Sequence, residues 1–162
     1  MKYFTSKWYN DKQKSKGTEL YYSYIKEHYD YYPKWIKDLD ILNKMIFDYT
    51  LISEVVISGN DINIRMVGIN GVNKPFWLRF IDASIAESPE EVEGQDIVAE
   101  EIYYTENSAE FHFLVIDDVT LETSNFTIKC KKAELEFDKQ TIFNKISDKL
   151  FDFKLYLRNK IH

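Results

Sequence analysis

Residues 51–66 read LISEVVISGNDINIRM, and they carry the clearest period in the chain. On both sides of Ser58-Gly59-Asn60-Asp61, every second side chain belongs to one face, which consists of Leu51, Ser53, Val55 and Ile57 before the turn and of Ile62, Ile64 and Met66 after it. A period of two is typical of β-strands, and a short cluster of Gly, Asn and Asp is typical of the turn between two paired strands. The stretch therefore predicts an antiparallel β-hairpin.

The same period continues downstream of the hairpin. It predicts further strands at residues 76–81, 97–104, 111–116, 120–131 and 133–137. Residues 83–95, which contain Pro89 and Gly94, are expected to form a loop. Residues 48–137 are therefore expected to fold as an antiparallel sheet of about six or seven strands.

The sequence upstream of the hairpin has a helical period instead. Thr18 is expected to cap a helix that runs to Tyr32, where Pro33 stops it. A second helix is expected from about residue 34 to residue 46, because its apolar side chains recur at helical spacing, at Trp35, Leu39, Leu42 and Ile46. The short interval between the two predicts an N-terminal helical hairpin within residues 1–47.

The C-terminal segment, residues 138–162, fits two patterns. A helical stripe is formed by Ile142, Ile146, Leu150, Phe153, Leu157 and Ile161. Residues 151–158 also alternate as a strand would, so the end of the segment stays open between helix and strand. We favour a C-terminal helix. The fold class is then α+β in a single domain, 1–162, with a helical part (1–47), an antiparallel sheet (48–137) and a C-terminal helix (138–162).

The overall composition is that of an ordinary globular domain. The chain has 162 residues, of which 44% are apolar and 30% are charged, and 5 are Gly and 3 are Pro. These values exclude disordered, collagen-like and disulfide-scaffold classes. A single cysteine, Cys130, cannot form an internal disulfide, and it is expected to be a small buried side chain. Neither a signal peptide nor a membrane span is predicted, and a cytoplasmic location is expected.

The charges are divided unevenly along the chain. The net charge is −6, yet residues 80–128 contain no Lys or Arg and thirteen acidic residues, namely Asp82, Glu87, Glu90, Glu91, Glu93, Asp96, Glu100, Glu101, Glu106, Glu110, Asp117, Asp118 and Glu122. The ordinary explanation is a solvated loop and the outer faces of a few strands, with basic elements packed beside them. The functional explanation is an acidic surface that attracts a cationic partner.

The functional explanation leads to a set of candidate partner-binding residues. They are the carboxylates of the predicted loop and of the strand after it, with two tyrosines as aromatic anchors: Glu87, Glu90, Glu91, Glu93, Asp96, Glu100, Glu101, Tyr103 and Tyr104. The hypothesis is a cytoplasmic protein-binding module, such as an immunity protein or inhibitor that neutralises a basic toxin or nuclease. Carboxylates would then occupy the positions that phosphates take in the groove of the nuclease.

A second hypothesis belongs to another functional class. Tyrosines are dense near the N-terminus, and lysines lie among them. Aromatic side chains interleaved with basic ones can bind single-stranded nucleic acid by stacking and charge. The Lys/Tyr-rich N-terminal third therefore suggests a nucleic-acid-binding accessory protein, although helical spacing would also bury several of these rings in the core.

Catalytic and metal-binding motifs are not found in the sequence. The three histidines have no metal-ligand spacing, and no nucleophile elbow or phosphate-binding loop occurs. Glu110 and His112 are two residues apart on a predicted strand, so they share a face and could act as an acid/base pair. The solvated side of a strand has the same pattern. We expect no enzyme activity, no cofactor and no metal.

The first nine residues carry a family resemblance. Met1 to Tyr9 read M-K-Y-F-T-x-x-W-Y, which resembles the opening of an uncharacterised bacterial domain-of-unknown-function family. Phe47-Asp48-Tyr49 is also similar to an F/L-H-D-x-x-I hairpin entry of small immunity-type proteins, but Phe47 stands at the His position, so no role of that His is carried over. The resemblance implies a small cytosolic bacterial protein.

Overall fold

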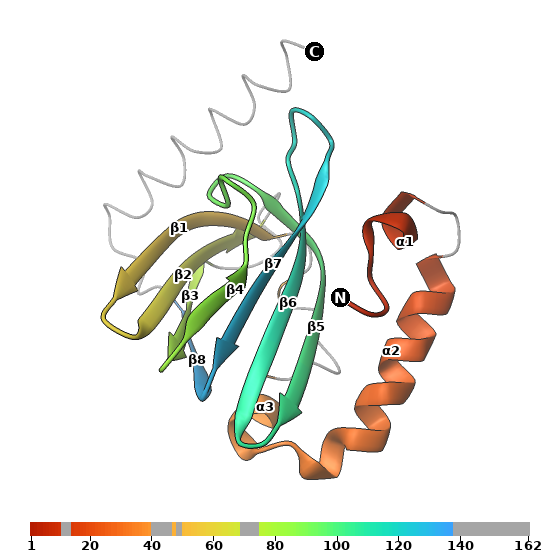
Figure 1. Cartoon of the computed structure of the whole chain (residues 1–162), viewed down its shortest axis with the longest axis vertical. Coiled ribbons are helices and arrows are strands. Elements are labelled where there is room, and N and C mark those ends of the chain that lie inside the picture. Colours follow the sequence, from red (N-terminus) through yellow and green to blue (C-terminus); the bar gives the residue numbers. More distant parts are fainter. Residues whose placement is uncertain (11–13, 40–46, 48–49, 69–74, 138–162) are drawn as a thin grey trace.

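A computed structural model describes residues 1–10, 14–39, 47, 50–68 and 75–137 of the chain (Figure 1). Four helical elements come first in the sequence: α1 (Ser6–Asn10), α2 (Lys14–His28), a short 3-10 helix η1 (Tyr29–Tyr31) and α3 (Lys34–Asp38). Strands follow them, and every strand pair is antiparallel. This arrangement confirms the α+β class.

Eight strands form one sheet in the described part of the chain. They are β1 (Thr50–Ser58), β2 (Asp61–Gly68), β3 (Phe76–Ile81), β4 (Ser84–Glu87), β5 (Asp96–Thr105), β6 (Ser108–Ile116), β7 (Thr123–Cys130) and β8 (Lys132–Phe137). Their order across the sheet is β4-β7-β6-β5-β1-β2-β3-β8. The β1–β5 pairing involves only two residue pairs, Thr50 with Ile97 and Leu51 with Asp96, so these two strands separate beyond it.

The two ends of this sheet meet. β3 continues into β4 through the short corner at residues 82–83, and β7 continues into β8 through Lys131. β4 pairs with β7 and β3 pairs with β8, and the Lys131 amide donates to the Ile81 carbonyl at the corner (3.1 Å). The same two chain segments therefore lie at both ends of the strand order, and the sheet closes on itself.

The predicted hairpin is confirmed, but the strand count was wrong. β1 and β2 pair from Thr50 with Gly68 to Ser58 with Asp61, and Gly59 supplies the positive φ (61°) that the two-residue turn needs. The eighth strand is β4, which lies inside the predicted loop 83–95. All four of its residues are exposed, so no alternation of buried and polar side chains marks it in the sequence. Pairing with β7 holds it in place.

The predicted helical hairpin is also not what the structure shows. α2 begins at Lys14, so Thr18 lies inside the helix rather than at its cap. The second helix is described only as the five residues of α3, and residues 40–46 lie outside the described part. No C-terminal helix is among the described elements, because the predicted segment 138–162 lies outside the described residues.

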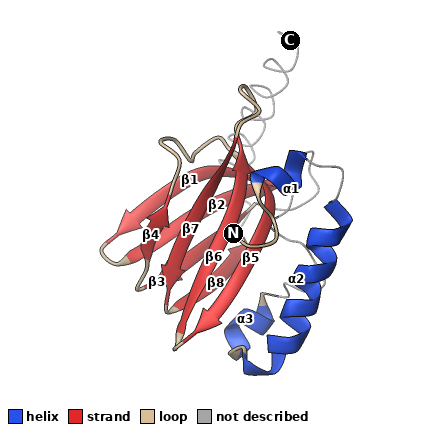
Figure 2. Cartoon of the chain, turned by 45° about the vertical axis from the view of Figure 1, so that its right-hand side comes forward, coloured by secondary structure: helices blue, strands red, loops and turns tan. Residues whose placement is uncertain are grey.

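The core lies between the two halves of the sheet and the helices beside it. It is dominated by phenylalanines, and the largest fully buried ones are Phe47, Phe76, Phe80, Phe111, Phe113 and Phe126. α2 runs alongside β5, and α3 lies across the lower end of the sheet (Figures 1 and 2). The helical part contributes the buried Tyr21, Ile25 and Tyr32, and α3 adds the buried Ile36.

Candidate protein-binding surface

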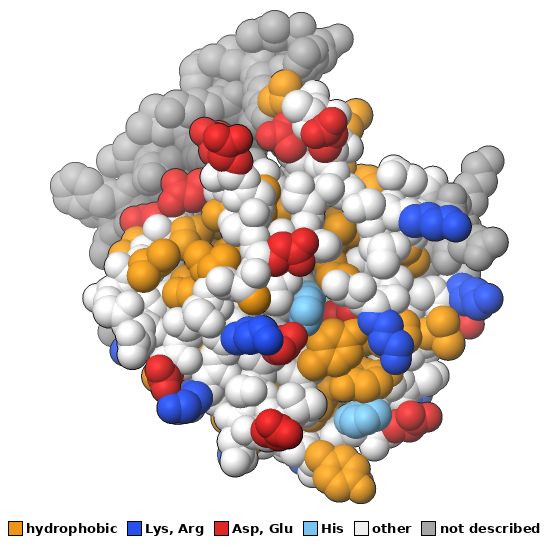
Figure 3. Space-filling model, viewed as in Figure 1, with side chains coloured by type: hydrophobic (Ala, Val, Ile, Leu, Met, Phe, Trp, Pro, Cys, Tyr) orange, Lys and Arg blue, Asp and Glu red, His pale blue; other side chains and the backbone are white. Residues whose placement is uncertain are grey.

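Two loops at one end of the sheet carry most of the candidate carboxylates. The β4–β5 loop precedes Asp96, and the β6–β7 loop follows Ile116, which pairs with both Asp96 and Thr123. The pairing therefore places the two loops side by side. We call their carboxylates, with those that flank them, the acidic rim: Glu87, Glu90, Glu91, Glu93, Asp96, Asp117, Asp118 and Glu122. Figure 3 shows acidic side chains at this upper end of the molecule.

The rim carboxylates are mostly open to solvent. Glu87, Glu90, Glu91, Glu93 and Glu122 are exposed, and the three aspartates are half-buried. Some of these carboxylates also hold the loops. Glu93 accepts the Val55 amide of β1 (2.8 Å), and Glu87 accepts the side-chain amide of Asn125 (3.2 Å). Among the described residues, Glu90, Glu91 and Glu122 form no ion pair with a basic side chain.

Two of the predicted binding residues lie inside the protein. Glu100 is 6% exposed and Glu101 is fully buried, so neither belongs to the acidic rim. β5 is covered on both faces. The sequence does not reveal this, because two consecutive Glu residues in a strand predict that at least one of the two side chains is exposed to solvent. Counting both as surface carboxylates was wrong.

The Glu101 carboxylate anchors the start of the chain to β5. One of its oxygens accepts the backbone amides of Tyr3 and Phe4, both at 2.6 Å, and the other accepts the Lys2 amide at 2.7 Å. The Tyr103 hydroxyl also donates to this carboxylate. Four donors thus satisfy a buried charge that would otherwise be very costly.

The two candidate aromatic anchors lie far from the acidic rim. Tyr104 is eight residues beyond Asp96 on an extended strand, a separation of roughly 26 Å. Tyr104 packs edge-on against Tyr32 and Trp35, and Tyr103 packs against Tyr24 and His112. Burial and the neighbouring Glu101 charge raise the pKa of the Tyr103 hydroxyl. The structure therefore uses both tyrosines to hold the helical part against β5.

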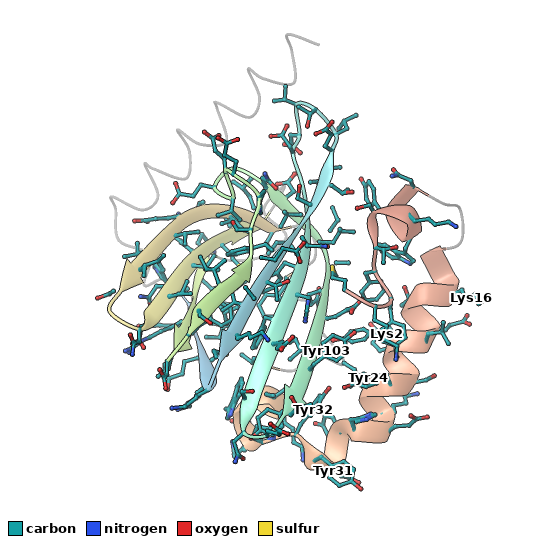
Figure 4. All side chains as sticks on the ribbon, viewed as in Figure 1. Lys2, Lys16, Tyr24, Tyr31, Tyr32 and Tyr103 are labelled. Carbon is teal, nitrogen blue, oxygen red and sulfur yellow. The ribbon has the colours of Figure 1, made fainter. Side chains whose placement is uncertain are left out.

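The tyrosines of the N-terminal third divide between core and surface. Tyr21 and Tyr32 are buried, and their hydroxyls serve the backbone of β5: the Ile102 amide donates to Tyr21 Oη (2.6 Å), and Tyr32 Oη donates to the Ile102 carbonyl (3.0 Å). Burial raises the pKa of both phenols. Lys2, Tyr24 and Tyr103 lie between α2 and β5, whereas Lys16 and Tyr31 point outward (Figure 4).

Glu110 and His112 share a face of β6, as the sequence predicted. His112 Nε2 lies 3.2 Å from Glu110 Oε2, and its Nδ1 lies 3.2 Å from the Thr127 hydroxyl. Lys129 also pairs with Glu110 (2.8 Å). Burial and the nearby α-amino group of Met1 lower the pKa of His112, despite the opposing pull of Glu110. The lowered pKa favours the neutral form of the ring at pH 7, and the adjacent Thr127 is buried.

The single cysteine is enclosed in the core. Cys130 is buried, and desolvation raises the pKa of its thiol to about 12, so the nucleophilic thiolate is scarce at neutral pH. Within the described ranges, no group of three His, Cys, Asp or Glu side chains is placed to hold a metal ion.

The structure adds two apolar residues that the sequence reasoning missed. Val119 and Leu121 lie in the β6–β7 loop of the acidic rim and are 56% and 69% exposed. Asp117 holds this loop: its side chain accepts the amides of Val119 and Thr120 (both 2.8 Å), and its carbonyl accepts that of Leu121 (2.8 Å). The sequence feature that could have revealed them is two apolar residues between acidic ones, in a stretch that has neither a strand period nor a helical period.

In the part of the chain that the structure describes, no helix combines the length and the apolar character that crossing a membrane requires. No protein-family model matches the chain, and neither a curated protein nor a solved structure matches it. The surface must therefore be interpreted from its own geometry.

Proposed function

We propose that this protein is a cytoplasmic protein-binding module whose acidic rim binds a cationic partner protein. The class of partner that fits best is a basic toxin or nuclease, which the module would neutralise as an immunity protein or inhibitor. The single observation that carries the proposal is the gathering of eight carboxylates at one end of the sheet, six from two loops and two from the adjoining ends of β4 and β5, within a segment that contains no Lys or Arg.

The arrangement supports attraction over a distance. Like charges that lie together on a surface add their fields, which accelerates the encounter with a cationic partner and makes that encounter sensitive to salt. The position of the rim also suits binding, because loops at the end of a rigid sheet are presented without strain on the core. A nuclease groove that binds phosphates is complementary to such a rim.

Val119 and Leu121, the two exposed apolar residues of the acidic rim, would supply the apolar contacts of the interface. Carboxylates at a rim guide association, whereas buried apolar contacts supply most of the affinity. Leu121 has a positive φ (60°), which is unfavourable for a bulky side chain. The loop holds this conformation through the Asp117 contacts, so Leu121 is presented in a fixed orientation.

Affinity capture with three forms of the full chain tests the proposal. The rim variant carries Glu87→Gln, Glu90→Gln, Glu91→Gln and Glu93→Gln. The control variant carries Glu19→Gln, Glu27→Gln, Glu54→Gln and Glu106→Gln, which are also exposed and change the net charge equally. Each form is used to capture proteins from an extract of the native cell at low and high salt, and the captured protein is identified by mass spectrometry and purified.

The expected result is a basic protein that the wild type and the control variant retain at low salt and that the rim variant loses. Calorimetry with the purified partner should then show the same order of affinities. Equal binding by the rim variant, or a partner without excess positive charge, would contradict the proposal.

The nucleic-acid hypothesis keeps one supporting observation. Tyr31 is 80% exposed, and Lys16 and Lys26 on α2 are exposed as well. These side chains remain available for stacking and phosphate contact. Fluorescence anisotropy with single-stranded RNA and DNA at low salt tests this alternative: binding that Tyr31→Ala and Lys16→Ala weaken would support it, and a flat titration would exclude it.

A further inference from the structure

A hollow lies on the outer face of the β1–β2–β3–β8 half of the sheet. Its volume is about 630 Å³, and its lining residues are Val56, Asn63, Trp77, Arg79, Glu134, Leu135 and Glu136. Ile64 and Leu78, on the opposite face of the same strands, are fully buried, so the hollow faces away from the core. Helices α1 and α2 lie beside β5, on the other half of the sheet (Figure 1). We call this feature the Trp77 hollow.

The strand register arranges the polar side chains of the hollow in two rows across β2, β3 and β8. The rows are Asn63–Arg79–Glu134 and Arg65–Trp77–Glu136. Trp77 therefore has a charged neighbour on each side, and an amide, a guanidinium and a carboxylate in the adjacent row. Because strand pairing rather than a loop holds these positions, the arrangement exists before a ligand binds, as in most small-molecule sites.

The charged side chains of this face nearly balance one another. Arg79 is paired with Asp61 (2.5 Å), and Lys132 is paired with Glu134 (2.6 Å). The face as a whole has three positive and four negative side chains, namely Arg65, Arg79 and Lys132 against Glu54, Asp61, Glu134 and Glu136. Unlike the acidic rim, such a surface has no strong attraction for an ion of either sign.

Trp77 and its polar neighbours suit an uncharged sugar. The indole face is a flat apolar surface, on which the C–H groups of one side of a pyranose ring can stack. The hydroxyls of the sugar need both donors and acceptors. The Asn63 amide supplies both, the Arg79 guanidinium donates, and the carboxylates of Glu134 and Glu136 accept. The volume of the hollow is within the range of small-molecule sites.

Two other kinds of ligand that stack on tryptophan suit this face less well. The phosphates of a nucleotide would be repelled by the carboxylates of Glu134 and Glu136, which are exposed. A cation could bind the indole face, but Glu134 is already paired with Lys132, and the cationic Arg79 lies beside Glu134 in the same row. A neutral ligand meets neither obstacle.

We propose that the Trp77 hollow binds an uncharged oligosaccharide. One sugar ring stacks on Trp77, and its hydroxyls form hydrogen bonds with Asn63, Arg79 and Glu136. The hollow and the acidic rim share no residue, so this proposal is independent of the proposed function.

An NMR titration of the full chain tests the proposal. The probes are the uncharged hexasaccharides of starch, cellulose, chitin, mannan and xylan, with spermine and adenosine triphosphate as the cationic and anionic comparisons. Trp77→Phe identifies the Trp77 indole N–H signal among those of the three tryptophans. The binding-site variants are Trp77→Ala and Asn63→Ala. Their controls are Tyr31→Ala, at an exposed aromatic residue of the helical part, and Asn125→Ala, at a half-buried asparagine of β7.

We expect at least one hexasaccharide, at millimolar concentration, to shift the Trp77 indole signal and the backbone signals of β2, β3 and β8. Added salt should leave its dissociation constant unchanged, since the ligand has no charge. Trp77→Ala should weaken the binding about tenfold and Asn63→Ala about fivefold, whereas both control variants should bind as the wild type does. The spectrum of each variant shows whether it is folded, and Asn63→Ala decides the question if Trp77→Ala is not.

Three outcomes would overturn the proposal. The first is that none of the hexasaccharides shifts the Trp77 signal. The second is that the shifts caused by a hexasaccharide lie outside the hollow or persist in both binding-site variants. The third is that only spermine or only adenosine triphosphate shifts the Trp77 signal, because the hollow would then bind an ion instead of a sugar.

Discussion

At the scale of single residues, the buried Glu101 carboxylate has the largest structural role. It joins the first four residues of the chain to β5, although nearly a hundred residues separate them in the sequence. Its donors also help to explain why the opening residues are aromatic: once their amides are fixed, Phe4 is buried and packs edge-on against Trp8 and Tyr21. Glu101 is therefore part of the folding core rather than of a binding surface.

Glu101→Gln should destabilise the protein by about 3 kcal/mol, because it removes charge-assisted hydrogen bonds and points an amide donor at other donors. Urea unfolding followed by circular dichroism measures this loss. Glu106→Gln, at an exposed position on the turn after β5, is the control and should change the free energy of unfolding by less than about 0.5 kcal/mol. Equal stability of the two variants would refute the anchoring role.

His112 gives the protein a pH-dependent stability. Its folded-state pKa lies below the ordinary value of 6.5, so the unfolded chain takes up a proton first as the pH falls. The free energy of unfolding therefore decreases as the pH drops through about 6.5 towards the lower folded pKa. Lys129 is the main cause that lowers the pKa of the Glu110 carboxyl. Protonation of this carboxyl therefore lowers the free energy of unfolding only in more acidic solution.

His112→Gln should flatten this slope, by at most about 1.4 kcal/mol per pH unit. Urea unfolding at a series of pH values between about 7 and 5.5 measures it. Ser23→Ala, at an exposed position of α2, removes no titratable group and is the control that should keep the slope of the wild type. A wild-type stability that stays constant or rises over this interval would show that His112 is not held neutral in the folded state.

At the scale of elements, α2 completes the sheet at β5. Beyond its two pairs with β1, β5 has an edge that no described strand covers, and two tyrosines of the helical part satisfy the amide and the carbonyl of Ile102. A helix can thus take the place of a strand at a sheet edge by presenting hydroxyls at the correct spacing. This also protects the edge from pairing with another chain.

Tyr21→Phe and Tyr32→Phe should each destabilise the protein by about 1–3 kcal/mol, since each leaves one buried backbone group of Ile102 without a partner. The Ile102 amide should exchange its hydrogen faster in Tyr21→Phe, which native-state hydrogen exchange measures. Tyr31→Phe, at an 80% exposed position, is the control. Unchanged exchange at Ile102 would mean that the helix does not seal the edge.

The contact between α1 and α2 depends on the absence of a side chain at Gly17. A Cβ atom there would lie 2.5 Å from the Trp8 indole ring. Alanine normally stabilises a helix by about 1 kcal/mol relative to glycine, but Gly17→Ala should lower the melting temperature because the ring must move. Ser23→Ala, at an exposed position of the same helix, should leave it unchanged or raise it. A higher melting temperature for Gly17→Ala would exclude the close packing.

The sequence predicts those elements whose period reflects one buried face. In β2, the buried Ile62, Ile64 and Met66 alternate with less buried polar residues because one side of the strand faces the core, and Tyr21 and Ile25 of α2 are one helical turn apart for the same reason. Burial in β1 does not follow the predicted alternation, since Leu51 and Ile52 are both buried and Ile57 is 62% exposed. β4 has no buried face, so its pairing with β7 leaves no trace in the sequence. The predicted end of the first helix at Tyr32 was also wrong, because α2 ends at His28 and the 3-10 helix η1 that follows ends at Tyr31.

At the scale of the whole molecule, the charge distribution was visible in the sequence, but its geometry was not. The thirteen acidic residues divide into a rim on two loops, a buried pair at Glu100 and Glu101, and side chains at other places on the surface. Strand pairing alone decides this division, because it brings the loops at 88–95 and 117–122 together and turns Glu101 towards the N-terminal segment. Charge counts reveal an excess, and only the topology shows where it lies.

The acidic rim should therefore govern how fast a cationic partner associates. With the captured and purified partner, we expect the rim variant to associate at least about tenfold more slowly than the wild type at low salt, and the difference should shrink as salt is added.

Stopped-flow measurement of the association rate constant, for the wild type, the rim variant and the control variant over a series of salt concentrations, tests this claim most directly. The account predicts that the control variant follows the wild type and that the rim variant loses most of the salt dependence. Equal rates and equal salt dependence for the rim and control variants would contradict it.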